Sequence, residues 1–147
     1  MTHTSSTLKA DTSPPLAVIG VRARNTAGVI RQIEAGFPFR ALERLGRVLD
    51  LGATDAAALI DLPTATYHRR KRAGQLASDE SDRLARIARI VTRAIALFEG
   101  DVERAREWLK RPKPALANAT PLDFSRTDFG AREVEALIDR LEHGVYS

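Results

Sequence analysis

From Thr26 onward, apolar residues recur every three or four positions, which is the period of an amphipathic helix. The longest stripe of this kind begins after Ser78 and ends before Gly100. Its members are Leu84, Ile87, Val91, Ile95 and Phe98. No segment alternates apolar and polar residues as a half-buried strand does, and no Asn-Gly hairpin turn occurs. The pattern therefore predicts an all-α fold.

Glycines, prolines and capping residues divide the helical part of the chain into shorter elements. The predicted helices cover residues 26–35, 39–51, 54–62, 64–73, 78–99, 101–111 and 130–143, with a further helix start at residue 120. The expected N-caps are Thr54, Ser78, Asp101 and Thr120. Residues 1–20 contain Pro14-Pro15 and no helical period, so we expect a disordered arm there.

A run of four bases lies on the helix predicted after Pro63, directly behind a short helix rich in small residues. Two short helices joined by a tight turn, with hydroxyls and then bases on the second, match the helix-turn-helix layout. The candidate DNA-binding residues are Thr64, Thr66, Tyr67, His68, Arg69, Arg70, Lys71 and Arg72. The threonines and the tyrosine can reach base edges or phosphates, and two or three of the bases can reach phosphates.

Two readings of this basic run stay open at the level of sequence. It is either a DNA-binding surface or a solvated basic face, and His68 is either a phosphate contact or an exposed residue without a role. One basic helix supplies few phosphate contacts, so DNA binding would call for a homodimer that occupies two half-sites of an operator.

The net charge of +4 is unevenly distributed. Residues 1–117 carry +7, whereas residues 118–147 carry −3. The basic part suits a phosphate-bearing partner, and the acidic end would avoid one.

The composition excludes several classes of protein. The chain has no cysteine and only three scattered histidines, which excludes a disulfide scaffold and leaves no plausible metal site. No Ser/His/Asp set, phosphate loop or paired carboxylates point to an enzyme or to a cofactor. No apolar run reaches the ~20 residues needed to span a membrane, and no signal peptide is visible. We therefore expect a cytoplasmic, non-enzymatic protein without cofactor or metal.

Several motifs of this chain recur together in one known family. They include Ala35-Gly36-Phe37-Pro38, Tyr67-x-Arg69-Arg70-Lys71, Trp108-Leu109, Thr120-Pro121-Leu122-Asp123 and the ending Arg140-x-Glu142-His143-Gly144-Val145-Tyr146-Ser147. Over roughly residues 26 to 147 the chain resembles the Xre/MbcA/ParS antitoxins, which are paired with RES-domain toxins. One departure is the loop Ala115-Leu116-Ala117-Asn118, where relatives tend to carry a Gly-Gly pair.

The resemblance implies an antitoxin with two partners. The expected division is a disordered arm at 1–20, a helix-turn-helix DNA-binding region at 21–77 and a helical toxin-binding region at 78–147. The helix-turn-helix region would bind the protein's own operator. The toxin-binding region would neutralise a RES toxin, an enzyme that depletes NAD, by placing the C-terminal segment at its active site. The implied toxin-binding residues are Arg140, Glu142, His143, Gly144, Val145, Tyr146 and Ser147.

Other interpretations of the C-terminal region compete with this one. The stripe Val134, Leu137, Ile138 and Leu141 is expected to be the helix's own contribution to the core, as is Trp108. Adjacent residues such as Glu142 and His143 point about 100° apart on a helix, which speaks against an acid/base pair. The alternative function is a stand-alone helix-turn-helix regulator whose C-terminal helices only dimerise.

Overall fold

A computed structural model describes residues 16–144 of the chain. Within that range it contains α-helices and two 3-10 turns but no strand, which confirms the all-α prediction. The elements are η1 (Ala17–Ile19), α2 (Thr26–Ala35), α3 (Arg40–Leu49), α4 (Ala53–Leu59), α5 (Thr64–Ala73), α6 (Ser78–Leu97), α7 (Val102–Leu109), η2 (Pro114–Leu116), α8 (Pro121–Phe124) and α9 (Asp128–Glu142). None of the helices described is long and apolar enough to cross a bilayer.

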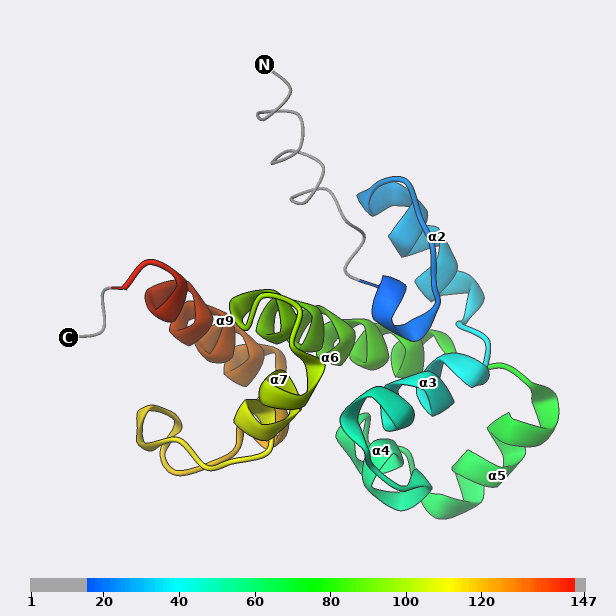
Figure 1. Cartoon of the computed structure of the whole chain (residues 1–147). Helices are drawn as coiled ribbons and strands as arrows, with labels where there is room; N and C mark the ends of the chain where they lie inside the picture. The colour runs from blue at the N-terminus through cyan, green and yellow to red at the C-terminus, as the bar shows by residue number, and fades with distance from the viewer. Residues whose placement is uncertain (1–15, 145–147) are drawn as a thin grey trace.

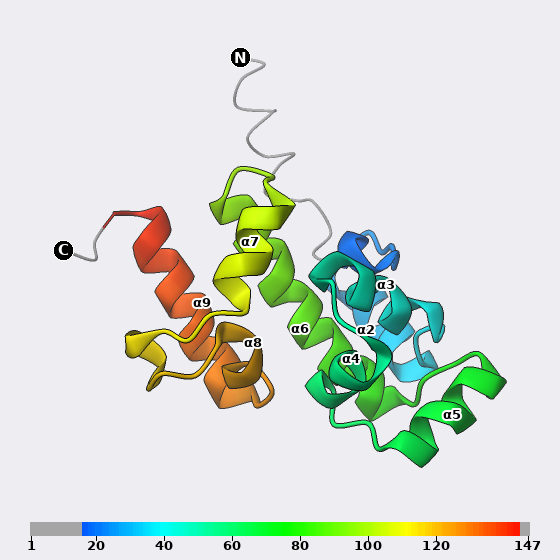
Figure 2. The ribbon, with the colours of Figure 1, turned by 60° about the horizontal axis from the view of Figure 1, so that its bottom comes forward.

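The long helix α6 runs through the middle of the molecule and separates two groups of helices (Figures 1 and 2). Helices α2 to α5 lie around its first half, and α7, α8 and α9 lie around its second half. Helix α9 packs along α6, and α7 covers the same half from another side. This arrangement puts α5 and the end of α9 at opposite ends of the protein.

The core follows the apolar stripes that the sequence shows. On α6, Leu84, Ile87 and Val91 are buried, while Ile95 and Phe98 are half-buried near its end. On α9, three members of the predicted stripe are fully or nearly fully covered, and Leu141 is half-buried. These three are Val134, Leu137 and Ile138. The prediction that this stripe belongs to the core is confirmed.

The segment just before α2 is structured, contrary to expectation. Leu16 and Ile19 are 3% and 1% exposed and pack against α3 and α6 through the turn η1. Gly20 closes that turn at φ 78°, a conformation that suits glycine. The prediction of a disordered arm is therefore wrong for residues 16–20, because a short apolar run is buried there without a helical period. Residues 1–15 lie outside the described part of the chain.

The predicted start or cap of four helices is off by one or two residues. Helix α3 begins at Arg40 and ends at Leu49, inside the predicted range 39–51. Helix α4 begins at Ala53 after Gly52, not at a Thr54 cap, and it ends at Leu59 rather than Leu62 because Asp61 adopts φ 52°. Helix α6 is capped at Ala77, not Ser78, since the Glu80 carboxylate accepts a hydrogen bond from the Ala77 N–H at 2.8 Å. Helix α9 begins at Asp128 instead of about Gly130, because the Thr127 hydroxyl accepts from the Gly130 N–H.

Two predicted caps agree with the structure. The Asp101 carboxylate accepts from the Arg104 N–H at 3.1 Å, and the Thr120 hydroxyl accepts from the Asp123 N–H at 3.0 Å. In the loop before α8, Ala117 and Asn118 both take left-handed geometry, at φ 57° and 66°. The loop therefore makes its turn without a glycine at either position.

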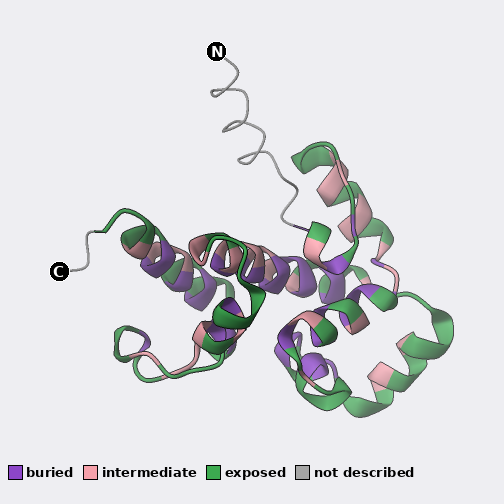
Figure 3. Cartoon of the chain, viewed as in Figure 1, coloured by how far each residue is buried: buried purple, intermediate pink, exposed green. Residues whose placement is uncertain are grey.

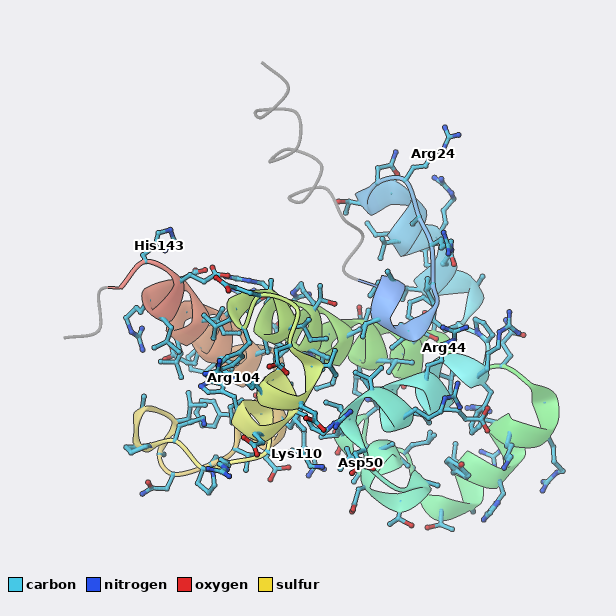
Figure 4. The ribbon with its side chains drawn as sticks, viewed as in Figure 1. Arg24, Arg44, Asp50, Arg104, Lys110 and His143 are labelled. Atoms are coloured by element: carbon cyan, nitrogen blue, oxygen red, sulfur yellow. The ribbon has the colours of Figure 1, made fainter. Side chains whose placement is uncertain are left out.

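Cationic side chains from the second group of helices bind the carbonyls that end α3. Arg106 Nε donates to the Val48 carbonyl at 3.0 Å, and Lys110 Nζ donates to the Leu49 carbonyl at 2.9 Å. Lys110 lies beside Asp50 in Figure 4 and also donates to its carbonyl. Positive charge at a helix C-terminus is favourable, so these bonds fix α7 on the first group of helices.

Candidate functional site

Helices α4 and α5 are joined by a tight turn whose apolar residues are buried. Ile60 and Leu62 are 0% and 6% exposed, and Asp61 between them is exposed in left-handed geometry. Pro63 is the N-cap of α5, and Gly74 ends the helix at φ 78°. Both ends of α5 agree with the sequence prediction. The turn holds α5 in place from its N-terminal side.

Helix α5 contains no buried residue and lies on the outside of the molecule (Figure 3). The exposed members of the predicted DNA-binding set are Thr64, His68, Arg69, Lys71 and Arg72. Spacings of three and four residues place most of them on one face. Ala65 is exposed on the same face, although alanine carries no polar group that would mark it as a candidate in the sequence. A small apolar side chain there can contact a thymine methyl group.

The Tyr67 ring faces the body of the protein. It meets the ring of Phe39, just before α3, edge to face with 5.1 Å between centroids, and it is half-buried. The His68 ring lies against its other side at 5.4 Å. Tyr67 thus fixes the orientation of α5, and Thr66 beside it is also half-buried.

Arg70 turns away from its basic neighbours and binds Glu80 of α6. Arg70 Nε and a terminal nitrogen donate to the two carboxylate oxygens of Glu80 at 2.8 and 3.1 Å. The hydrogen bonds that Arg70 donates to the Glu80 carboxylate raise the pKa of Arg70. Of the four consecutive bases, Arg69, Lys71 and Arg72 remain on the exposed surface.

The last turn of α9 is held by Arg93 of α6. This guanidinium pairs with Asp139 and, at 3.1 Å, with Glu142. The hydrogen bond from Arg93 lowers the pKa of Asp139 below its ordinary value. Glu142, one of the residues implied in toxin binding, is thus engaged within the protein and marks the point to which α9 is anchored.

The remaining residues of that predicted set lie at the end of α9 or beyond it. Arg140, His143 and Gly144 are exposed, and Figure 4 shows His143 at the outer end of the helix. A ring nitrogen of His143, Nδ1, lies 2.8 Å from the Asp139 carbonyl. Val145, Tyr146 and Ser147 lie outside the described residues.

A groove of ≈ 390 Å³ lies beside the end of α9, lined by Leu97, Phe98, Glu99, Arg104, Trp108 and Leu141. The Arg104 guanidinium stands 5.2 Å from the Phe98 ring, and Lys113 Nζ stands 5.0 Å from the Trp108 ring. Burial, and then the charge of Arg111, lowers the pKa of Lys113. No sequence pattern indicates this groove, because the period of α7 predicts Trp108 in the core. The ring is half-buried and packs against the core while lining the groove.

Comparison with known proteins assigns both halves of this structure. Residues 28–89 match the antitoxin Xre-like helix-turn-helix domain, and residues 93–144 match the antitoxin Xre/MbcA/ParS C-terminal toxin-binding domain. An Antitoxin Xre of Photorhabdus laumondii is 30% identical over 140 residues, which cover 95% of each chain. The chain belongs to the Xre/MbcA/ParS antitoxin family.

Two other relatives of this antitoxin span most of its length. An Antitoxin Xre of Yersinia enterocolitica is 31% identical over 130 residues, 88% of each chain. A protein of a Sphingobium species, named Prs ADP-ribosylating antitoxin, is 23% identical over 144 residues, 92% of this chain and 91% of the relative. The two matched domains meet within α6, so a single helix carries the junction between the helix-turn-helix and the toxin-binding part.

Proposed function

We propose that this antitoxin neutralises a RES-domain toxin that depletes NAD, and that it represses its own operon by binding operator DNA as a homodimer. The toxin would be held by the end of α9 and the C-terminal segment, and the DNA by α5. The observation that carries the proposal is the separation of these two surfaces at opposite ends of α6 (Figure 2). One protein can then serve two partners without overlap between them.

The exposed face of α5 supports the DNA-binding half of the proposal. Thr64, His68 and Arg69 share the exposed surface of a recognition helix with Lys71 and Arg72. Arginine and lysine contacts to phosphate supply affinity, whereas the N-terminal residues of such a helix read base edges. We assign Arg70 and Tyr67 to positioning this helix, because each is engaged with the body of the protein.

The charge and position of the last residues support the toxin-binding half. The final thirty residues carry −3, and an acidic segment suits a pocket whose arginines and lysines bind the pyrophosphate of NAD. Val145, Tyr146 and Ser147 follow the anchored turn at Glu142 in the sequence, and we propose that they enter that pocket. In this arrangement Tyr146 offers an aromatic ring with a polar tip, which suits the centre of an interface.

The relative from Sphingobium adds a chemical argument. Its name connects that protein with ADP-ribosylation, a reaction that takes ADP-ribose from NAD. A toxin that hydrolyses NAD and one that transfers ADP-ribose would each need a pocket for NAD, and an acidic segment would suit either pocket. The antitoxin itself would act by occupying that pocket, without a cofactor and without chemistry of its own.

Co-expression with the protein encoded next to the antitoxin gene tests this proposal, with growth and cellular NAD as readouts. The neighbouring protein alone should stop growth and deplete NAD, and the antitoxin should restore both. Growth arrest with unchanged NAD would show a toxin of different chemistry. Growth arrest that the antitoxin does not relieve would contradict the proposed partnership.

A further inference from the structure

The groove beside the end of α9 lies where two helices end together. Helices α6 and α9 run in the same direction and end on the same side of the molecule (Figures 1 and 2). Leu97 and Phe98 end α6, and Leu141 belongs to the last turn of α9. All three residues are half-buried and line the groove. Its apolar wall is therefore built at the point where the chain leaves α9.

Cations lie against aromatic rings along this groove. Arg104 is placed over the Phe98 ring and Lys113 over the Trp108 ring. A second hollow of ≈ 200 Å³ continues the groove, because Phe98, Arg104 and Trp108 line both. Within residues 16–144, neither Arg104 nor Lys113 forms an ion pair. Such a surface suits a further aromatic ring, which gains both apolar contact and attraction to the cations.

The chain leaves α9 next to this surface. The Gly144 N–H donates to the Leu141 carbonyl at 3.3 Å, so Gly144 lies one turn from a residue that lines the groove. Gly144 takes φ 68°, the left-handed geometry that turns a chain away from a helix. Val145, Tyr146 and Ser147 follow in the sequence. Three extended residues span about 10 Å, which brings the Tyr146 ring within reach of the groove.

We propose that the segment Val145-Tyr146-Ser147 lies in this groove in the free antitoxin, and that the toxin draws it out. In the docked state the Tyr146 ring packs against Trp108 and the Arg104 guanidinium, while Val145 covers Leu141. The Tyr146 hydroxyl stays at the open side of the groove, in contact with water. The groove thus supplies the apolar surface and the cation that this ring can use.

Docking of this segment would set how tightly the antitoxin binds its toxin. This step rests on the proposed function, in which the same segment enters the toxin's pocket. The segment cannot occupy both places, so only the undocked fraction of the antitoxin can bind. If the segment is docked about nine-tenths of the time, the apparent Kd of the complex rises about tenfold.

Quenching of tryptophan fluorescence by acrylamide tests the docked state in the full-length antitoxin, without toxin. Trp108 is the only tryptophan of the chain, so the signal reports on the groove alone. Tyr146→Ser should raise the quenching constant, because it removes the ring that covers Trp108. Tyr146→Phe is the matched control: it keeps the ring and should be quenched like wild type. Equal quenching of wild type and Tyr146→Ser would overturn the proposal.

Binding of the toxin gives a second test, in which the direction of the effect is decisive. Arg104→Ala removes a cation that holds the docked ring, so it should lower the Kd of the toxin complex by up to about tenfold. Lys71→Ala, an exposed base of α5, is the control and should bind the toxin like wild type. Weaker binding by Arg104→Ala would overturn the proposal, since the groove would then be a contact surface for the toxin.

The two tests also separate this inference from the proposed function. The quenching experiment needs no toxin, so its result does not depend on what the toxin does to NAD. A toxin that leaves NAD unchanged would contradict the proposed function. Stronger quenching of Tyr146→Ser than of wild type would still support the docked segment.

Discussion

The Arg70 guanidinium donates hydrogen bonds to both carboxylate oxygens of Glu80, at 2.8 and 3.1 Å, across the turn between α5 and α6. Glu80 is 5% exposed, and its carboxylate also accepts a hydrogen bond from the N–H of Ala77, the N-cap of α6. One arginine from the basic run therefore ties α5 to the central helix α6. The neighbouring bases project from a helix that this ion pair holds in place.

Replacing Arg70 should lower stability, in contrast to replacing the base before it. Arg70→Ala leaves the buried Glu80 carboxylate without its cation, and an uncompensated buried charge is strongly destabilising. We expect Tm to fall by several degrees in a thermal melt. Arg69→Ala removes an exposed side chain and should melt like wild type. Equal melting temperatures for the two variants would contradict the role given to Arg70.

The exposed bases of α5 should determine how DNA binding depends on salt. Lys71→Ala and Arg72→Ala should each weaken binding similarly for all sequences and reduce the slope of log K against log[salt] by about one per subunit. A fluorescence anisotropy titration of the operator at several salt concentrations measures this slope. Arg132→Ala, an exposed base on α9, is the control and should leave the slope unchanged. If Arg132→Ala changes this slope and the two α5 variants do not, another face of the protein binds DNA.

The Arg93–Asp139 pair should make the protein sensitive to acid. The hydrogen bond from Arg93 lowers the pKa of Asp139 in the folded state below its ordinary value of 3.8. The unfolded chain therefore takes up this proton at a higher pH than the folded one. The stabilisation is fully present above that ordinary value and is lost as the pH falls through the lower folded pKa. Chemical denaturation below about pH 4 should show a shallower loss of stability for Asp139→Asn than for wild type. An unchanged pH dependence would contradict this.

Gly130 should be essential to the junction of α8 and α9. A Cβ at this position would lie 1.8 Å from the Phe124 carbonyl oxygen, so Gly130→Ala must displace the start of α9. We expect a loss of about 3 kcal/mol in the free energy of unfolding, measured in urea. Gly52→Ala is the control, since a Cβ there meets no atom within 4 Å and φ is −72°. It should cost no more than about 1 kcal/mol, because it only replaces the N-cap glycine of α4 by the less favourable alanine.

Much of the fold could be predicted from patterns among residues that are close together in the sequence. The ends of α5 follow from Pro63 and Gly74, and the core stripe of α9 follows from its period, because both depend on neighbouring residues alone. Arg70 turns inward because it pairs with Glu80. The two residues meet only because of the path that the chain takes between α5 and α6, and local sequence signals do not show that path. Leu16 and Ile19 form a run too short to show a period, so their burial could not be predicted.

Deletion of residues 144–147 tests most directly whether the C-terminal segment blocks the toxin while α5 binds DNA. The deletion leaves the Arg93 pairs with Asp139 and Glu142 in place, so α9 should stay folded. NAD consumption by the purified toxin should no longer be inhibited, while the truncated antitoxin should still shift operator DNA as wild type does. Full inhibition of the toxin by the truncated protein would show that the C-terminal segment is not the part that blocks it.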